Sequence, residues 1–183
     1  MPYTVTTTVF PEVHILSPKV FGDQRGYFFE SFNKKDFQKA TGLDVEFVQD
    51  NHSRSVKGVL RGLHYQLQHP QGKLVRVTQG TVYDVIVDIR RSSLNFGKWF
   101  GLELSAENKL QLWFPEGFAH GFLVTSESAE FIYKTTDYWY PEYEHSLHWN
   151  DPEIGIHWPL DIQPIISAKD ESASALELIE TFE

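Results

Sequence analysis

Short apolar runs alternate with turn-forming residues over most of this chain. Strand-like segments rich in β-branched and aromatic residues recur, with Gly-, Asn- and Ser-containing turns between them. We expect strands over residues 45–49, 59–66, 74–78, 82–89, 101–104, 110–114, 121–125 and 131–138. Many short strands without intervening helices predict an all-β fold, an antiparallel sandwich or jelly roll. We expect one domain that spans residues 1–183.

Two short helices are expected beside the strands. Asn33 is a suitable N-cap and Gly42 a suitable C-terminal residue, so we expect a helix between them. A second helix is expected over residues 173–179, where Leu176 and Ile179 fall on the same face.

The strand expected over residues 82–89 carries two carboxylates on one face. Strand alternation places Asp84 and Asp88 on the same side as Val82 and Ile86. Such carboxylates must be wet or paired. A carboxylate that faces a barrel interior would mark a site, and a solvated strand face is an equally good interpretation.

Arg61 and His64 pose a geometric problem. They are three positions apart, so on a regular strand they would face opposite sides of the sheet. Both can reach one pocket only if the strand bulges or twists, and Gly62 between them is a plausible place for a bulge.

Composition excludes several classes of protein. The 183 residues are 41% hydrophobic and 15% aromatic, which is typical of a globular chain with a core. The formal net charge of −9 argues against a nucleic-acid partner, because affinity for nucleic acid comes from Lys and Arg that neutralise phosphates. There is no cysteine, hence no disulfide, and we find no signal peptide or membrane-spanning run. We expect a cytoplasmic protein without a membrane partner.

Two histidines lie in distinctive contexts: His64 in LRGLHYQ (residues 60–66) and His120 in WFPEGFAHGF (residues 113–122). Histidine has the side-chain pKa closest to neutrality, so it is a candidate for proton transfer. Arg61 and Lys73 lie close to His64 in sequence. A base accompanied by cations suits the removal of a proton from carbon in an anionic substrate.

The PxGxxH spacing that ends at His120 resembles the second motif of the cupin superfamily, a small β-barrel fold. Metal-binding cupins carry His-x-His and a Glu in the first motif, but the chain reads HYQ from His64. A catalytic metal site commonly keeps three protein ligands, so we expect no metal. A site with Asp84 as third ligand is the alternative.

Several other residues have a functional and an ordinary interpretation. Tyr133 is a core or interface residue unless its hydroxyl faces the cavity of His64, where it could donate a proton. The aromatic run at residues 138–140 could stack on a base or form a subunit interface. Asp170 is either a helix cap or a carboxylate that orients a histidine base. Arg25 is either a ligand or half of a surface salt bridge.

Taken together, seven segments resemble the dTDP-4-dehydrorhamnose 3,5-epimerase family, a metal-free branch of the cupins. The matching segments are FGDQRGYFFE (21–30), FVQDNHS (47–53), VLRGLH (59–64), QGKLVR (71–76), residues 113–122, YKTTDY (133–138) and SAKD (167–170). Each segment alone is a weak signal, and their occurrence in this order along nearly the whole chain is a strong one.

The resemblance implies a role for each matching residue. His64 is the base that takes protons from C3 and C5 of a dTDP-4-keto-6-deoxy sugar, paired with Asp170. Tyr133 is the acid on the opposite face, and Lys73 stabilises the enolate oxygen. The substrate-binding positions are Arg25, Glu30, Gln49, Asn51, Arg61, Lys73, His120, Trp139, Glu144 and Lys169.

The family also implies a stacking aromatic, a dimer and no cofactor. Trp139 stands where bacterial members commonly carry Tyr, so the stacking surface for thymine is kept and a hydroxyl is lost. The resemblance further implies a homodimer that shares strands across its interface.

Three alternatives remain. The first is a related epimerase acting only at C3 or C5, or a ketoisomerase, and the presence of both His64 and Tyr133 favours an epimerase. The second is a non-catalytic nucleotide-sugar-binding cupin, against which the complete set of His64, Asp170, Tyr133 and Lys73 argues. The third is a metal-dependent cupin oxygenase, which the missing His-x-His disfavours.

Overall fold

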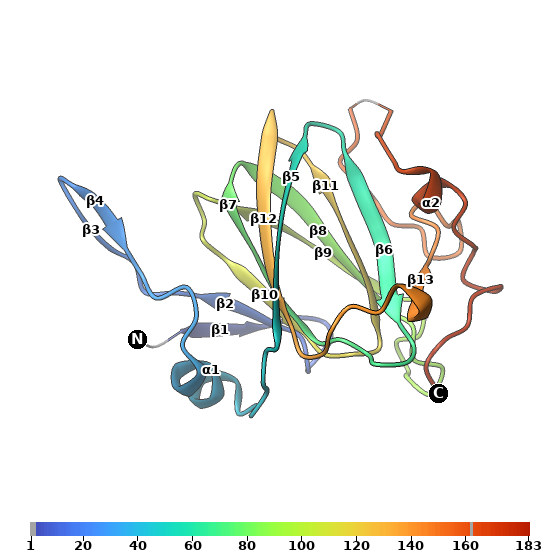
Figure 1. Cartoon of the computed structure of the whole chain (residues 1–183), viewed down its shortest axis with the longest axis horizontal. Helices are drawn as coiled ribbons and strands as arrows, with labels where there is room; N and C mark the ends of the chain where they lie inside the picture. The colour runs from blue at the N-terminus through green and yellow to red at the C-terminus, as the bar shows by residue number, and fades with distance from the viewer. Residues whose placement is uncertain (1–2, 162) are drawn as a thin grey trace.

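The computed structural model describes residues 3–161 and 163–183, in which two antiparallel sheets face each other and a hairpin projects to one side (Figure 1). The six-stranded sheet has the order β1 (Thr4–Thr7), β2 (His14–Ser17), β10 (Gln111–Phe114), β7 (Lys73–Gln79), β12 (Ser128–Thr135) and β5 (Gln49–Val56). The five-stranded sheet has the order β13 (Glu144–Ser146), β6 (Leu60–Gln66), β11 (Phe118–Val124), β8 (Thr81–Asp88) and β9 (Trp99–Ser105). This arrangement confirms the all-β, cupin-type jelly roll.

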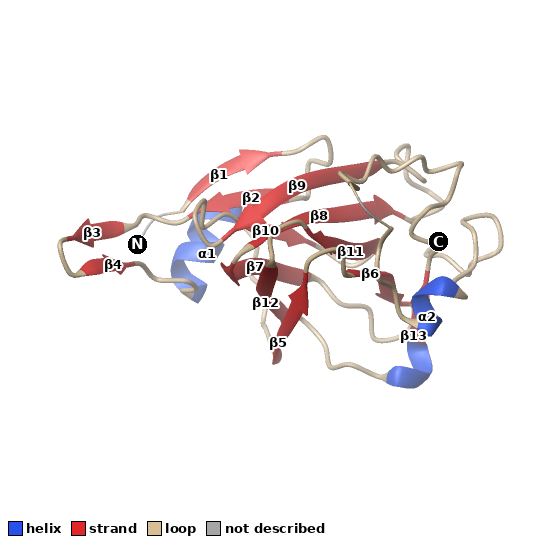
Figure 2. Ribbon diagram, turned by 90° about the horizontal axis from the view of Figure 1, so that it is seen from above, coloured by secondary structure: helices blue, strands red, loops and turns tan. Residues whose placement is uncertain are grey.

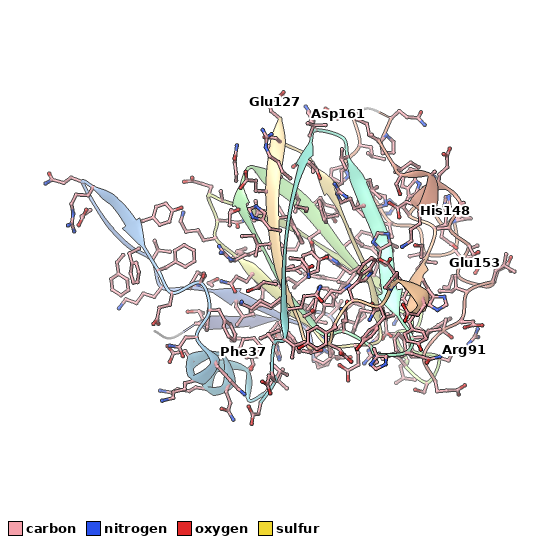
Figure 3. All side chains as sticks on the ribbon, in the orientation of Figure 1. Phe37, Arg91, Glu127, His148, Glu153 and Asp161 are labelled. Carbon is pink, nitrogen blue, oxygen red and sulfur yellow. The ribbon has the colours of Figure 1, made fainter. Side chains whose placement is uncertain are left out.

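The main core fills the space between the two sheets, where the side chains crowd together in Figure 3. It combines residues from the six-stranded sheet, such as Val75 and Phe131, with residues from the five-stranded sheet, such as Ile86 and Phe122. The rings of Phe122 and Phe131 stack at 4.3 Å across the two sheets. Apolar burial of this kind stabilises the sandwich by about 25 cal/mol per Å² of area removed from water.

One predicted helix is confirmed, and it packs against β2, β7 and β10 on the face of the six-stranded sheet that lies away from the main core. α1 (Lys34–Thr41) begins at Asn33, whose side chain accepts a hydrogen bond from the backbone amide of Asp36, and ends at Gly42 with φ of 77°. Phe37, which is labelled in Figure 3, anchors it, because its ring packs edge-on against that of Trp113 at 5.6 Å. In the described part of the chain no helix is long and apolar enough to cross a membrane.

The helix predicted over residues 173–179 is wrong. The only helix in the described C-terminal region is α2 (Ala168–Glu171), capped by Ser167, and the segment after it runs irregularly over the five-stranded sheet. There the backbone amide of Leu176 donates to Asp151, and Leu147 pairs with Ser174 as a bridge. These partners take up the backbone groups that a helix would have used internally, while Leu176 and Ile179 still become buried.

The strand predicted over residues 45–49 is also misplaced, because β5 begins at Gln49 and continues to Val56. This strand reads QDNHSRSV, and its buried-side positions are polar. Apolar alternation therefore could not reveal it. The structure adds strands β1, β2 and β13, a single turn of 3-10 helix (Pro141–Tyr143), and a hairpin of β3 (Phe21–Asp23) and β4 (Gly26–Phe28).

The open question about the carboxylates of β8 is answered in favour of burial. Asp84 and Asp88 are both fully shielded from solvent. Asp88 is held by Arg90 and Ser93 at the end of the strand. Asp84 faces the interior between the sheets, on the same side as Val82 and Ile86.

The predicted irregularity at Gly62 is present. Strand β6 pairs with β11 so that Arg61 lies opposite Phe122 and His64 lies opposite His120, with a shift in register between these pairs. The extra residue turns Arg61 and His64 toward the same side, as a β-bulge does. Gly62 has φ of 109°, and a Cβ at this position would lie 2.6 Å from the carbonyl oxygen of His120.

The β3–β4 hairpin extends away from both sheets (Figures 1 and 2). Its strands pair only with each other, through Phe21–Phe28, Gly22–Tyr27 and Asp23–Gly26. Phe21, Tyr27 and Phe28 are exposed. The ammonium of Lys109 lies 4.5 Å from the centre of the Tyr27 ring, but the three rings remain largely exposed. An isolated two-stranded hairpin is only marginally stable in water.

Replacement of Gly62 by alanine should destabilise the fold by more than about 2 kcal/mol, because a positive φ and a backbone contact both oppose a Cβ there. Gly42→Ala is the matched control, since Gly42 also has a positive φ but open space around its Cβ position. It should cost about 1–2 kcal/mol. Urea denaturation measures both losses, and an equal loss for the two variants would contradict the close contact at Gly62.

Candidate active site

A cavity of about 360 Å³ opens between the two sheets, and most of the predicted site residues line it. The predicted residues on its wall are Gln49, Asn51, Arg61, His64, Lys73, His120, Tyr133, Trp139 and Glu144. The remaining wall is formed by His52, Ser53, Gln71, Gly121, Phe122 and Phe131. The six-stranded sheet contributes β5, β7 and β12, and the five-stranded sheet contributes β6, β11 and β13.

His64 is held by a carboxylate that lies behind it. Its Nε2–H donates to Oδ1 of Asp170 at 2.6 Å, which leaves Nδ1 as the basic nitrogen of the ring. The other oxygen of Asp170 accepts a hydrogen bond from the hydroxyl of Ser167 at 2.9 Å. Burial opposes ionisation of Asp170, but hydrogen bonds from His64, Ser167 and the Gly62 amide outweigh it and lower its pKa. The pair therefore combines an ionised carboxylate with an oriented imidazole.

Glu144 provides a second carboxylate beside His64. Its Oε1 lies 4.0 Å from Nδ1 of His64, and its other oxygen accepts a hydrogen bond from the ammonium of Lys169. Burial raises the pKa of Glu144, but Lys169 and His64 outweigh that effect and the net pKa is lowered. An imidazolium formed at His64 would thus face negative charge on both sides.

Tyr133 faces the cavity from the opposite sheet, on β12. Burial raises the pKa of its hydroxyl, with a further contribution from Glu144, whereas Arg61 lowers it. The hydroxyl therefore keeps its proton at neutral pH and can act as a donor. Arg61 is steadied by a hydrogen bond from its Nε to the Ser55 hydroxyl at 3.0 Å.

Lys73 and His120 add two further polar groups to the wall. Lys73 is almost fully buried, and burial lowers its pKa to about 8 while the charges of Glu144 and Asp84 act against that decrease. His120 is buried as well, and its Nε2–H donates to Asp84 at 2.9 Å. In the described ranges, no three or more His, Asp or Glu side chains gather closely enough to hold a metal ion.

Trp139 lies at the rim, where its side chain remains half exposed. Its backbone amide donates to the side-chain oxygen of Gln49 at 3.0 Å, and the amide group of Gln49 donates to Asn51 at 2.9 Å. These contacts tie the loop after β12 to the start of β5. An indole fixed at the mouth of a polar cavity presents a flat face to a planar ligand.

Three predicted binding residues, Arg25, Glu30 and Lys169, do not line this cavity, and Lys169 instead donates to Glu144 beside it. Arg25 is at the tip of the β3–β4 hairpin, where its guanidinium makes a two-pronged contact with Asp23 and is 85% exposed. Glu30 follows the hairpin and accepts a hydrogen bond from the side chain of Asn33. Their role as ligands of a substrate stays a prediction.

Sequence reasoning did not assign Ser167, Ser53 or Gln71 to the site. Ser167 could have been found as the N-cap three residues before Asp170, because a capping serine and the capped carboxylate are neighbours in space. Ser53 and Gln71 carry no comparable signal, since isolated polar residues on strands are usually solvated.

Comparison with known proteins identifies the family of this chain. The family model for dTDP-4-dehydrorhamnose 3,5-epimerase matches residues 7–177. The epimerase of that name from Pseudomonas aeruginosa is 59% identical over 170 residues, covering 93% of this chain and 94% of the relative. The one from Salmonella typhimurium is 58% identical over 174 residues, covering 94% and 95%.

A solved structure is similarly close. The Legionella pneumophila dTDP-6-deoxy-D-glucose-3,5-epimerase, crystallised with dTDP-4-keto-L-rhamnose, is 53% identical. It superposes with a TM-score of 0.95 over 97% of this chain and 95% of that one. On the strength of the matched family model, the identity over nearly the full length and the shared fold, this chain belongs to the dTDP-4-dehydrorhamnose 3,5-epimerase family.

Proposed function

We propose that this chain catalyses the 3,5-epimerisation of dTDP-4-dehydro-6-deoxy-D-glucose to dTDP-4-dehydro-L-rhamnose, a step of dTDP-L-rhamnose biosynthesis. The curated relatives carry this activity in their names. The observation that carries the proposal is the placement of His64 and Tyr133 on opposing sheets around one cavity. Epimerisation removes a proton from one face of a carbon and returns a proton to the other, so it needs two such groups.

The reaction begins at His64. Protons at C3 and C5 of the sugar are acidic because the carbanion left behind delocalises onto the C4 ketone oxygen. Nδ1 of His64 takes the proton, and Asp170 at 2.6 Å stabilises the resulting imidazolium. Tyr133 then delivers a proton from the opposite face.

Lys73 stabilises the enolate oxygen at C4. A preorganised cation at the place where negative charge develops is usually the largest contribution to catalysis. Its pKa of about 8 means that the ammonium form prevails below that pH and is lost as the pH rises through it. Base, acid and cation all come from side chains, so the proposed step uses no cofactor and no metal.

The remaining wall residues bind the nucleotide sugar. Arg61 and His120 on the wall, together with Lys169 beside Glu144, would hold the pyrophosphate and sugar, Gln49 and Asn51 would add amide groups, and the ring of Trp139 would stack on thymine. The partner is a small anionic molecule. The net charge of −9 disfavours nucleic acid, and we infer a cytoplasmic protein that functions as a single domain over residues 1–183.

The hairpin supports a homodimer. Arg25 and Glu30 match substrate-binding positions of the family, yet Arg25 is 85% exposed on the β3–β4 hairpin, which extends away from both sheets (Figure 1). In a symmetric dimer the β3–β4 arm would reach the partner subunit. The partner's surface would cover the exposed aromatic residues of the arm, and Arg25 would lie at the partner's cavity.

Proton exchange in D₂O tests the proposed reaction. With dTDP-4-keto-6-deoxy-D-glucose, NMR or mass spectrometry should show deuterium at both C3 and C5. His64→Ala should slow both exchanges by ~10²–10⁴-fold while dTDP still binds. His148→Ala, outside the cavity, is the control. Label at one carbon alone would indicate a single-site epimerase, and no label with bound substrate would indicate a binding protein.

Tyr133→Phe should separate the two proton transfers. The base remains in this variant, so exchange of the abstracted proton with solvent should persist while net epimerisation falls by ~10²-fold or more. Tyr138→Phe, an exposed tyrosine five residues away, should lose neither. Equal loss of exchange and epimerisation in Tyr133→Phe would rule out the donor role.

Mixing two inactive variants tests the contribution of the hairpin. If Arg25 acts in the partner's cavity, a mixture of Arg25→Ala and His64→Ala proteins should regain activity that neither has alone. In the mixed dimer, one cavity has both His64 and an intact Arg25 from its neighbour. The mixture should be unfolded and refolded together, with sedimentation confirming dimers. No gain in well-formed mixed dimers would show that Arg25 does not serve the other cavity.

A further inference from the structure

Asp84 is a buried carboxylate that the proposed reaction leaves without a role. It lies on β8 and faces the interior between the sheets, with 0% of its surface exposed. Oδ2 accepts the hydrogen bond from Nε2 of His120, whereas Oδ1 has no hydrogen-bond partner among the described residues. A carboxylate with one unsatisfied oxygen is expensive to bury. A function that depends on its charge would account for that cost.

The second observation concerns Lys73, which reaches into the same interior from β7 of the opposite sheet. It is 8% exposed and lines the cavity. Within residues 3–161 and 163–183, the structure gives Lys73 no ion pair with a carboxylate. The N–H donors of its ammonium therefore remain available to a bound molecule. The energetic cost of burying this cation has to be offset by charged groups that are not in direct contact with it.

The electrostatic partners of Lys73 come from several strands. Negative charge comes first from Glu144 on β13 and then from Asp84 on β8, and both act to raise the pKa of Lys73 against its burial. His120 on β11 lies between Asp84 and the cavity, and His64 and Tyr133 complete the wall.

Burial raises the pKa of Asp84, and the charge and hydrogen bond of His120 and the charge of Lys73 only partly offset that increase, so the net pKa is raised. Both neighbours therefore favour the ionised form of Asp84.

The pKa of the His120 ring depends on the charges of the same neighbours. Burial lowers the pKa of His120, and the charges of Lys73 and His64 lower it further, against an opposing effect of Asp84. The ring is therefore neutral, and its single proton lies on Nε2 because that nitrogen faces the carboxylate at 2.9 Å. Nδ1 remains as an acceptor.

We propose that Asp84 is a positioning residue of this site: its carboxylate keeps Lys73 in the ammonium form and holds His120 in the tautomer that is protonated at Nε2. A counter-ion in direct contact would occupy the donors of Lys73. A carboxylate set back behind His120 stabilises the charge and leaves the donors free. The inference deepens the proposed function and rests on it, because Lys73 is the group that meets the enolate oxygen.

The first test follows protonation without any substrate. NMR of protein labelled at the lysine side-chain ε-carbon, with the Lys73 signal identified from its absence in Lys73→Arg, should show Lys73 titrating near pH 8. In Asp84→Asn, a variant of equal size, proton binding at Lys73 should weaken about tenfold or more. Asp88→Asn is the matched control, because Asp88 is equally buried on the same strand but pairs with Arg90. It should leave the titration of Lys73 unchanged.

A measurement on the unmodified protein covers the case in which Asp84→Asn does not fold. Nitrogen-15 NMR of the histidine rings at neutral pH should show His120 neutral and protonated at Nε2. A charged ring, or a proton on Nδ1, would overturn the assignment. An unchanged titration of Lys73 in folded Asp84→Asn would overturn it as well.

The rate profile then separates this inference from the proposed reaction. The rate of turnover should fall as the pH rises through the pKa of Lys73, and in Asp84→Asn this fall should begin at lower pH. If the NMR titration of Lys73 moves but the alkaline limb of the rate does not, the electrostatic role of Asp84 stands and the role of Lys73 at the enolate is contradicted.

Discussion

The close contact of β6 and β11 at Gly62 is the constraint on which the site depends. The two backbones approach so closely there that a Cβ on Gly62 would lie 2.6 Å from a carbonyl oxygen of His120. The resulting shift in register turns Arg61 and His64 into one cavity. The amide of the same glycine also donates to Asp170, which fixes the carboxylate behind the base. A single residue without a side chain thus aligns a cation, a base and the orienting acid.

The cavity contains two histidine–carboxylate pairs whose surroundings differ. Asp170 receives hydrogen bonds from His64, Ser167 and a backbone amide, and its pKa is lowered. Asp84 receives one hydrogen bond, and burial raises its pKa. When two groups of the same type lie in different environments, their pKa values move apart. One site can then use the same residue types for different tasks. The first pair suits proton abstraction, and the second suits the fixed placement of charge.

The sequence predicts those parts of the fold in which packing follows a simple repeat. The strands of the core alternate apolar residues, and α1 carries its capping residues, so both are found from the chain alone. Strand β5 was misplaced because its inward positions, such as Gln49 and Asn51, are polar where they form the cavity wall. A functional surface therefore hides a strand from apolar alternation, since it replaces the residues that would reveal it.

The helix predicted over residues 173–179 is wrong for a different reason. Leu176 and Ile179 have helical spacing, but the hydrogen bond that the Leu176 amide donates to Asp151 and the bridge at Ser174 determine the backbone there. Local periodicity cannot foresee such long-range partners. The burial of Asp84 cannot be predicted from the sequence for the same reason. Alternation assigns a residue to a face of a strand, whereas the identity of the buried face depends on what packs against it.

The hairpin shows the limit of reasoning from one chain. Arg25 lies in a segment that matches the family, yet its position 85% exposed at the tip of an arm is not where a substrate ligand is expected. Phe21, Tyr27 and Phe28 are exposed on strands of three residues each, which can stabilise themselves only weakly. Exposed aromatic residues that protrude together are costly in water and become favourable when a second surface covers them. A linear motif marks a residue as part of a site, but it does not say which copy of the chain holds the cavity. The proposed homodimer would cover this arm and bring Arg25 to the partner's cavity.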